Sequence, residues 1–170
     1  LLGLPAVVSK YLLRILIMLM VYMILALSLN MITGYLGEIS LGHIIFFAVG
    51  AYASSLFMLK LGFNCWIAAF LGSCVSALFG ALLGIQTLRV SGTYLAIVSL
   101  GYYYVIRMII INWMSLTNGA NGLFNIPAPS IFGLDLTIRN SGAYYHILGY
   151  LLLTLLVNYL IINSKIGRAI

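Results

Sequence analysis

The stretch YLLRILIMLMVYMILALSL at residues 11–29 sets the class of this protein, because Arg14 is its only charged residue. A helix needs about 20 predominantly apolar residues to cross the hydrocarbon core of a bilayer, and this run is long enough. Arg14 lies within one turn of the start of the run, from where its charged end can reach the membrane interface. We therefore expect a transmembrane helix over residues 11–29.

The composition of the whole chain agrees with this expectation. Of the 170 residues, 64% are hydrophobic and 6% are charged, whereas a soluble domain carries about a quarter charged residues. So little charge cannot solvate a globular surface, and only a bilayer allows this much apolar surface to face outward. Soluble, disordered and fibrous classes are excluded.

Four more apolar stretches follow the first. We expect them to form transmembrane helices at residues 39–59, 65–88, 93–113 and 143–163. A glycine-rich, unwound segment is expected to enter the helix at 39–59, and a long polar segment at 114–142 separates the last two helices. The predicted fold is an all-α polytopic transmembrane bundle of about five spans, forming one domain over residues 1–170.

The charges of the chain do not point to nucleic acid. The formal net charge is +6, but the eight Lys and Arg residues are spread singly between apolar runs and form no basic patch. Isolated basic residues of this kind are typical of membrane interfaces. Alternating spans place four of them on one side and three on the other, so charge alone does not orient the chain.

The residues that enzymes and metal sites use are absent or scattered. The sequence lacks CxxC, HExxH and GxxxxGK[ST] patterns, and His43 and His146 are far apart in the chain. In alternating spans, the two carboxylates, Glu38 and Asp135, fall on opposite sides of the membrane, so they cannot act as an acid and base pair. We therefore predict a conduit with no metal, no cofactor and no catalytic residues.

In a conduit, polar residues within apolar runs are the candidates for the substrate path, because each is costly in lipid unless it faces protein or water. Segment 30–43 is the richest in them, and its glycines interrupt the helix and free backbone groups for a substrate. Glu38 can equally be hydrated in an interfacial turn, His43 can bond a neighbouring helix, and Arg107 can reach the interface near Trp113. The path candidates are Asn30, Glu38, Ser40, His43 and Arg107.

Small residues recur every four positions in the third span and form one stripe along the helix. Close backbone approach supplies much of the association energy between helices in lipid, so we expect this stripe to pack against another helix. The stripe consists of Ala68, Gly72, Ser76, Gly80 and Gly84.

The long polar segment opens with two Asn-Gly steps, which favour tight turns and exposed backbone N–H groups. Its candidate contacts with a partner or a substrate carboxylate are Thr117, Asn118 and Asn121. The same residues can instead serve only to turn the chain. A shorter recurrence, Ser-Leu-Gly at 40–42 and again at 99–101, is too short to indicate a repeat.

Four blocks of sequence, taken together, resemble one family, the LivM-type permeases of branched-chain amino acid ABC importers. The blocks occur in the order found in that family, and with the spans between them the resemblance extends over nearly the whole chain. They are LSLNMITGYLGEISLGHIIFFAVGAY at 27–52, SGTYLAIVSLGYYYVIR at 91–107, INWMSLTNGANGLFNIPAP at 111–129, and SKIGRAI at 164–170.

The resemblance implies a subunit of a bacterial inner-membrane importer that is not itself an enzyme. Its implied partners are a second LivH-type permease, two cytoplasmic ATPases and an extracytoplasmic binding protein that delivers leucine, isoleucine or valine. The C-terminal segment resembles the lead into a cytoplasmic ATPase-docking loop, so Lys165, Gly167 and Arg168 are expected at the ATPase-facing edge. Residues 114–142 then face outward. The family continues beyond both ends of this chain, so we expect an incomplete permease.

Three other functions remain open from the sequence. The same architecture can import urea, short amides or other amino acids, which uptake assays would distinguish. An ATP-independent carrier or channel would transport without ATP hydrolysis. In an assembly subunit without a path of its own, polar substitutions would abolish assembly and not flux.

Overall fold

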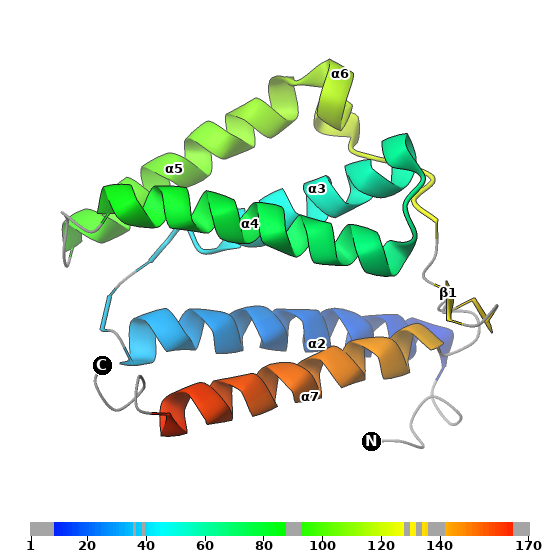
Figure 1. Ribbon diagram of the computed structural model, residues 1–170, viewed down its shortest axis with the longest axis horizontal. Coiled ribbons are helices and arrows are strands. Elements are labelled where there is room, and N and C mark those ends of the chain that lie inside the picture. Colours follow the sequence, from blue (N-terminus) through cyan, green and yellow to red (C-terminus); the bar gives the residue numbers. More distant parts are fainter. Residues whose placement is uncertain are drawn as a thin grey trace. The chain divides into compact units, whose positions relative to one another are not determined.

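The computed structural model describes residues 9–35, 37–38, 40–87, 93–127, 130–131, 134–135 and 142–164. Five helices in this part of the chain are long and apolar enough to cross a membrane, which confirms the predicted all-α transmembrane class. They are α2 (Lys10–Asn30), α3 (Ile44–Leu61), α4 (Cys65–Thr87), α5 (Thr93–Asn112) and α7 (Gly142–Asn163), labelled in Figure 1.

Several short elements complete the described chain. A π-helix, η1 (Met31–Tyr35), continues α2 directly. A single helical turn, α6 (Met114–Thr117), and a 3₁₀ turn, η2 (Gly119–Asn121), follow α5. Strands β1 (Ser130–Ile131) and β2 (Leu134–Asp135) pair antiparallel, with Ser130 opposite Asp135.

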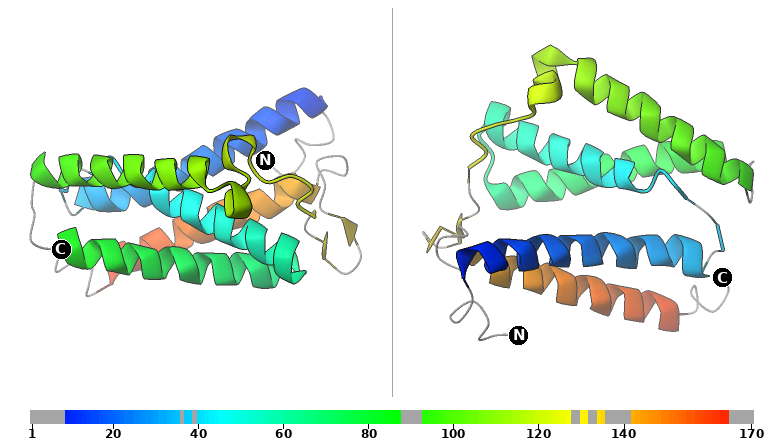
Figure 2. Two further views of the ribbon diagram at one scale, coloured as in Figure 1. Left: turned by 90° about the horizontal axis from the view of Figure 1, so that it is seen from above. Right: turned by 180° about the vertical axis from the view of Figure 1, so that it is seen from behind.

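The chain divides into two compact units, each described by itself. The first, the α2–α7 unit, contains α2, η1, the two short strands and α7. Its core joins Leu13, Ile17 and Met20 of α2 to Tyr144 and Leu148 of α7. The first halves of both helices meet, so the helices run parallel (Figure 2). Parallel packing is what alternating membrane crossings require of the first and fifth spans.

The second, the α3–α5 unit, contains α3, α4, α5, α6 and η2. Helices α3 and α4 form an antiparallel pair, since Phe46 meets Ser76 while Ser54 lies against Gly72. The turn between them uses Gly62, whose φ of 65° is the left-handed conformation that glycine adopts at little cost. Helix α3 also lies beside α5, and these two run parallel (Figure 1).

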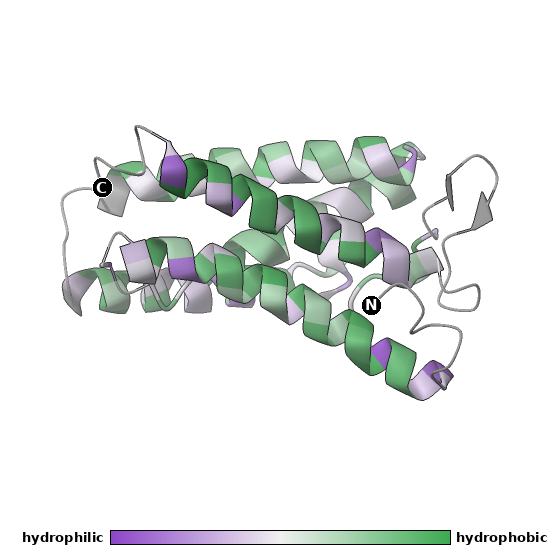
Figure 3. Ribbon diagram, turned by 90° about the horizontal axis from the view of Figure 1, so that it is seen from below, coloured by the Kyte–Doolittle hydropathy of each residue, from purple (hydrophilic) through white to green (hydrophobic). Residues whose placement is uncertain are grey.

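Most large apolar side chains of the spans are exposed in this chain alone; Phe70 and Leu78, for example, are 68% and 69% exposed. Figure 3 shows that apolar residues predominate along each long helix. A helix that is apolar on all sides is suited to lipid or to a buried position among other helices.

Several helix boundaries differ from those expected from hydropathy, and the largest shift is at the start of α3. The helix expected at 39–59 begins at Ile44, because the chain before it is held in a non-helical path in which Gly37 has a φ of 68°. The helix expected to end at residue 29 reaches Asn30 and then widens into η1. Thr33 donates a hydrogen bond to the Leu29 carbonyl within this widened turn.

Candidate functional site

The segment before α3 is held against α5 by one serine. Ser99, itself buried, accepts a hydrogen bond from the Leu41 N–H at 3.0 Å and donates one to the Ala96 carbonyl at 2.9 Å. Gly42 is buried beside it, and a Cβ added at Gly42 would collide with the Ser99 carbonyl oxygen. Only glycine therefore permits the observed approach of the two segments.

Ser99 also shows how deep this segment lies in its unit. It stands six residues into α5, about 9 Å along the helix axis. The non-helical backbone around Leu41 and Gly42 therefore runs alongside a span and not beyond its end. Such backbone is tolerated at membrane depth only where protein or a water-filled cavity satisfies its polar groups, and the Ser99 hydroxyl does this for the Leu41 N–H.

The candidate path residues fall in both units. Asn30 is the exposed last residue of α2, and its side chain lies over Gly34, where an added Cβ would stand 2.5 Å from Oδ1. Glu38, Ser40 and His43 lie in the other unit, all partly buried, on the segment that precedes α3. These three thus share one short segment, which Ser99 of α5 contacts at Leu41 and Gly42, and the structure does not relate Asn30 to them.

His43 stands where α3 begins. Its ring meets Phe46 edge-on, with ring centroids 5.9 Å apart, so the imidazole is packed against the first turn of its own helix. This contact positions the ring beside the non-helical segment.

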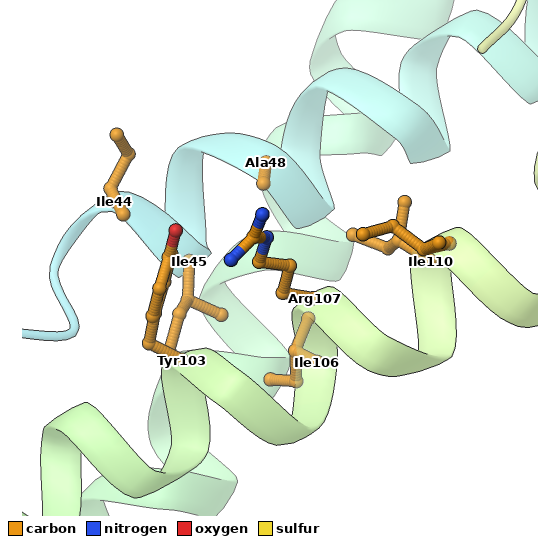
Figure 4. A pocket seen from close by; sticks show the side chains of 8 residues that line it. Ile44, Ile45, Ala48, Tyr103, Ile106, Arg107 and Ile110 are labelled. Atoms are coloured by element: carbon orange, nitrogen blue, oxygen red, sulfur yellow. The ribbon is translucent and has the colours of Figure 1, made fainter. Parts of the chain in front are cut away.

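A cavity of about 220 Å³ opens between α3 and α5, adjoining the start of α3. Five isoleucines and an alanine form most of its wall, and two polar side chains, Tyr103 and Arg107, enter it from α5 (Figure 4). Its lining residues are Ile44, Ile45, Ala48, Tyr103, Ile106, Arg107, Ile110 and Ile111.

Arg107 extends from α5 toward α3, and its guanidinium ends beside Ala48 (Figure 4). Side chains on a helix lean toward its N-terminus, so the Arg107 stem leads away from the Trp113 end of α5. The arrangement favours the cavity over the interface as the place of this charge. Tyr103 lies one turn earlier on the same face of α5.

The small-residue stripe of α4 lies mainly against α3. A Cβ added at Gly72 would stand 2.8 Å from both the Gly50 carbonyl oxygen and the Ser54 Cβ. The Ser76 hydroxyl donates a hydrogen bond to the Phe46 carbonyl at 2.7 Å. Ala68 is fully buried, Gly80 faces the Phe46 ring, and a Cβ added at Gly84 would meet no atom within 4 Å.

The loop residues have distinct places. Thr117 is buried, and its hydroxyl lies 2.6 Å from the Ile110 carbonyl oxygen and 2.7 Å from that of Trp113, which ties α6 back to α5. Asn118 adopts the left-handed conformation and donates a hydrogen bond to the Gly122 carbonyl. Asn121 is exposed. Of these three, Asn121 is the one most open to a partner.

Two site residues stand out in the structure that the sequence did not single out, Ser99 and Gly50. Ser99 is a polar residue in an apolar run, so the criterion applied to Arg107 would have found it. Gly50 lies on α3 opposite the α4 stripe, and its role depends on which faces of the two helices meet. Lys165, Gly167 and Arg168, expected at the ATPase-facing edge, lie outside the described residues.

Comparison with known proteins gives consistent matches. The family model described as "Branched-chain amino acid transport system / permease component" matches residues 11–170. The high-affinity branched-chain amino acid transport system permease protein LivM of Salmonella typhimurium is 41% identical over 131 residues, covering 77% of this chain and 31% of the relative. The Escherichia coli protein of the same name is 38% identical over 140 residues, covering 81% of this chain and 33% of the relative.

This chain spans about a third of the length of the curated relatives it matches. No solved structure matches it significantly. The family match nevertheless extends over nearly all of the chain. It includes the five long helices and the segment before α3 that Ser99 contacts. The chain therefore belongs to the family of branched-chain amino acid transport system permease components.

Proposed function

We propose that this chain is part of a permease subunit that lets leucine, isoleucine and valine cross the bacterial inner membrane in an ATP-driven importer. The observation that carries the proposal is the match to two LivM permeases over about four fifths of the chain. Five apolar helices and a polar, partly non-helical segment beside one of them support a membrane conduit.

Energy for transport comes from other subunits in this proposal. The 170 residues contain no P-loop that could bind ATP. The proposed partners are two cytoplasmic ATPases, a second LivH-type permease and an extracytoplasmic binding protein. Closure of the ATPases rocks the two permeases against each other, so that the path opens alternately to each side. The close contact of α3 and α4 suits two helices that move together as one rigid element.

Uptake in cells tests the cargo. The complete permease containing this chain, produced with its partner subunits in a bacterium that lacks branched-chain amino acid uptake, should restore accumulation of radiolabelled leucine, isoleucine and valine. Urea and acetamide, offered in the same cells, should not accumulate above the empty-vector level. Restored uptake of urea or amides without uptake of leucine would overturn the proposed cargo. It would favour import of urea or short amides by the same architecture.

A further inference from the structure

We propose that the cavity between α3 and α5 binds the transported amino acid, with Arg107 holding its α-carboxylate and the isoleucines holding its branched side chain. This inference rests on the proposed function and names the site within it. Three features support it: the apolar cavity wall, the Arg107 guanidinium directed toward α3, and the contact of Ser99 with the segment before α3.

The cavity has the two-part chemistry of an apolar amino acid. Six of its eight lining residues are isoleucine or alanine, which offer an aliphatic surface without hydrogen-bonding side chains. The remaining two, Tyr103 and Arg107, offer hydrogen-bond donors, and both belong to α5. The volume of about 220 Å³ corresponds to about seven water molecules at liquid density, the size range of a small amino acid.

The guanidinium is set to receive an anion. A charged side chain within a membrane span is costly unless it meets a partner or a polar path. Among the residues that the structure describes, Arg107 makes no hydrogen bond or ion pair, so its donors remain available. A guanidinium binds a carboxylate through two parallel N–H···O bonds. A cargo that has only a hydroxyl or an amide group cannot form an equally strong pair of bonds with it.

Two neighbours strengthen the anion preference. The hydroxyl of Tyr103 is a second donor one turn away on α5, directed toward Ile44 in Figure 4. The cavity also adjoins the first turn of α3, where the helix dipole places partial positive charge that favours a carboxylate.

The cavity is held in shape before a cargo arrives. Ser99 fixes Leu41, and Gly42 rests on the Ser99 carbonyl, so the first turn of α3 cannot slide along α5. Ile44 and Ile45 therefore stay opposite Tyr103 and Ile106. A preformed wall lowers the ordering cost of binding.

The test uses the complete importer in proteoliposomes, with binding protein saturated with leucine so that capture outside the membrane is constant. Arg107→Gln should lower leucine uptake at least tenfold, and Arg107→Lys should leave an intermediate rate because it keeps the charge without the bidentate geometry. Arg14→Gln, the matched control on α2, should transport as wild type. Assembly, measured by size-exclusion chromatography, should be unchanged in all three variants, and basal ATPase activity should be unchanged in the Arg14→Gln control.

A second variant tests the apolar wall without altering charge. Ala48→Leu fills part of the cavity, so leucine uptake should fall at least fivefold more than valine uptake. Equal loss for both cargoes, or no loss, would overturn the assignment of the cavity to the side chain.

Two further outcomes would overturn the role of Arg107. One is wild-type leucine uptake by Arg107→Gln. The other is a defect of Arg107→Gln that appears only in vesicles containing anionic lipid, which would show that the guanidinium meets a lipid headgroup. Failure of the wild-type importer to take up leucine at all would count against the proposed function instead.

Discussion

At the scale of single residues, the contact of Gly42 with Ser99 controls where α3 begins. The Ser99 hydroxyl accepts a hydrogen bond from the Leu41 N–H. Because Gly42 has no side chain, the backbone before α3 can lie directly against the Ser99 carbonyl. A hydrogen bond of this kind contributes about 0.5 to 1.5 kcal/mol, so both residues are expected to affect stability. Their positions also set the wall of the neighbouring cavity.

Replacing Gly42 with alanine tests this contact. The added methyl group collides with the Ser99 carbonyl oxygen, and overpacking of this kind costs about 1 to 3 kcal/mol. We expect a lower unfolding temperature for the complete permease purified in detergent. Gly101→Ala is the matched control, because a Cβ there meets nothing within 4 Å and alanine is the better helix former. Equal unfolding temperatures for the two variants would contradict the contact.

At the scale of helices, hydropathy found the long elements and missed what depends on contacts between them. Runs of apolar residues predict the five long helices because each must cover about the thickness of the hydrocarbon core. The start of α3 could not be predicted this way, since it depends on Ser99, 58 residues from Leu41 in the chain. The burial of Thr117 could not be predicted from hydropathy either. The surrounding Asn-Gly steps indicate an exposed turn, but Thr117 is buried by its contacts with Ile110 and Trp113.

The α3–α4 pair carries a prediction of its own. Gly72→Leu should separate the two helices, because the Gly50 carbonyl and Ser54 leave no space for a side chain at that position. Gly84→Leu, on the same stripe, should be tolerated, since a Cβ there meets no atom within 4 Å. Fluorescence-detected size-exclusion chromatography of the complete permease checks both variants. A monodisperse Gly72→Leu protein of wild-type thermal stability would show that the close approach is not needed.

At the scale of the whole molecule, alternating crossings account for the helix directions within each unit. Helices α2 and α7 are parallel, α3 and α4 are antiparallel, and α3 and α5 are parallel, as five successive crossings require. The candidate site was only partly predictable on this scale. The sequence singled out Arg107 and the segment at 38–43, but the cavity depends on which faces of α3 and α5 meet.

The direction of the crossings gives a further prediction. If the C-terminal end of α7 is cytoplasmic, the turn after α3 and the loop after α5 face outward. Single cysteines in a protein whose Cys65 and Cys74 are replaced by serine test this. Asn64→Cys and Asn121→Cys should react with a membrane-impermeant maleimide in intact cells, and Ser164→Cys should react only after lysis. The reverse pattern would invert the topology.

The central claim, that this chain belongs to an ATP-driven permease for branched-chain amino acids, is tested most directly by uptake into sealed vesicles. The complete importer is reconstituted in proteoliposomes with ATP enclosed on the ATPase side and leucine-loaded binding protein outside. We predict that radiolabelled leucine accumulates in the lumen with enclosed ATP and fails to accumulate with a non-hydrolysable analogue. Equal leucine uptake with ATP and with the analogue would contradict the account.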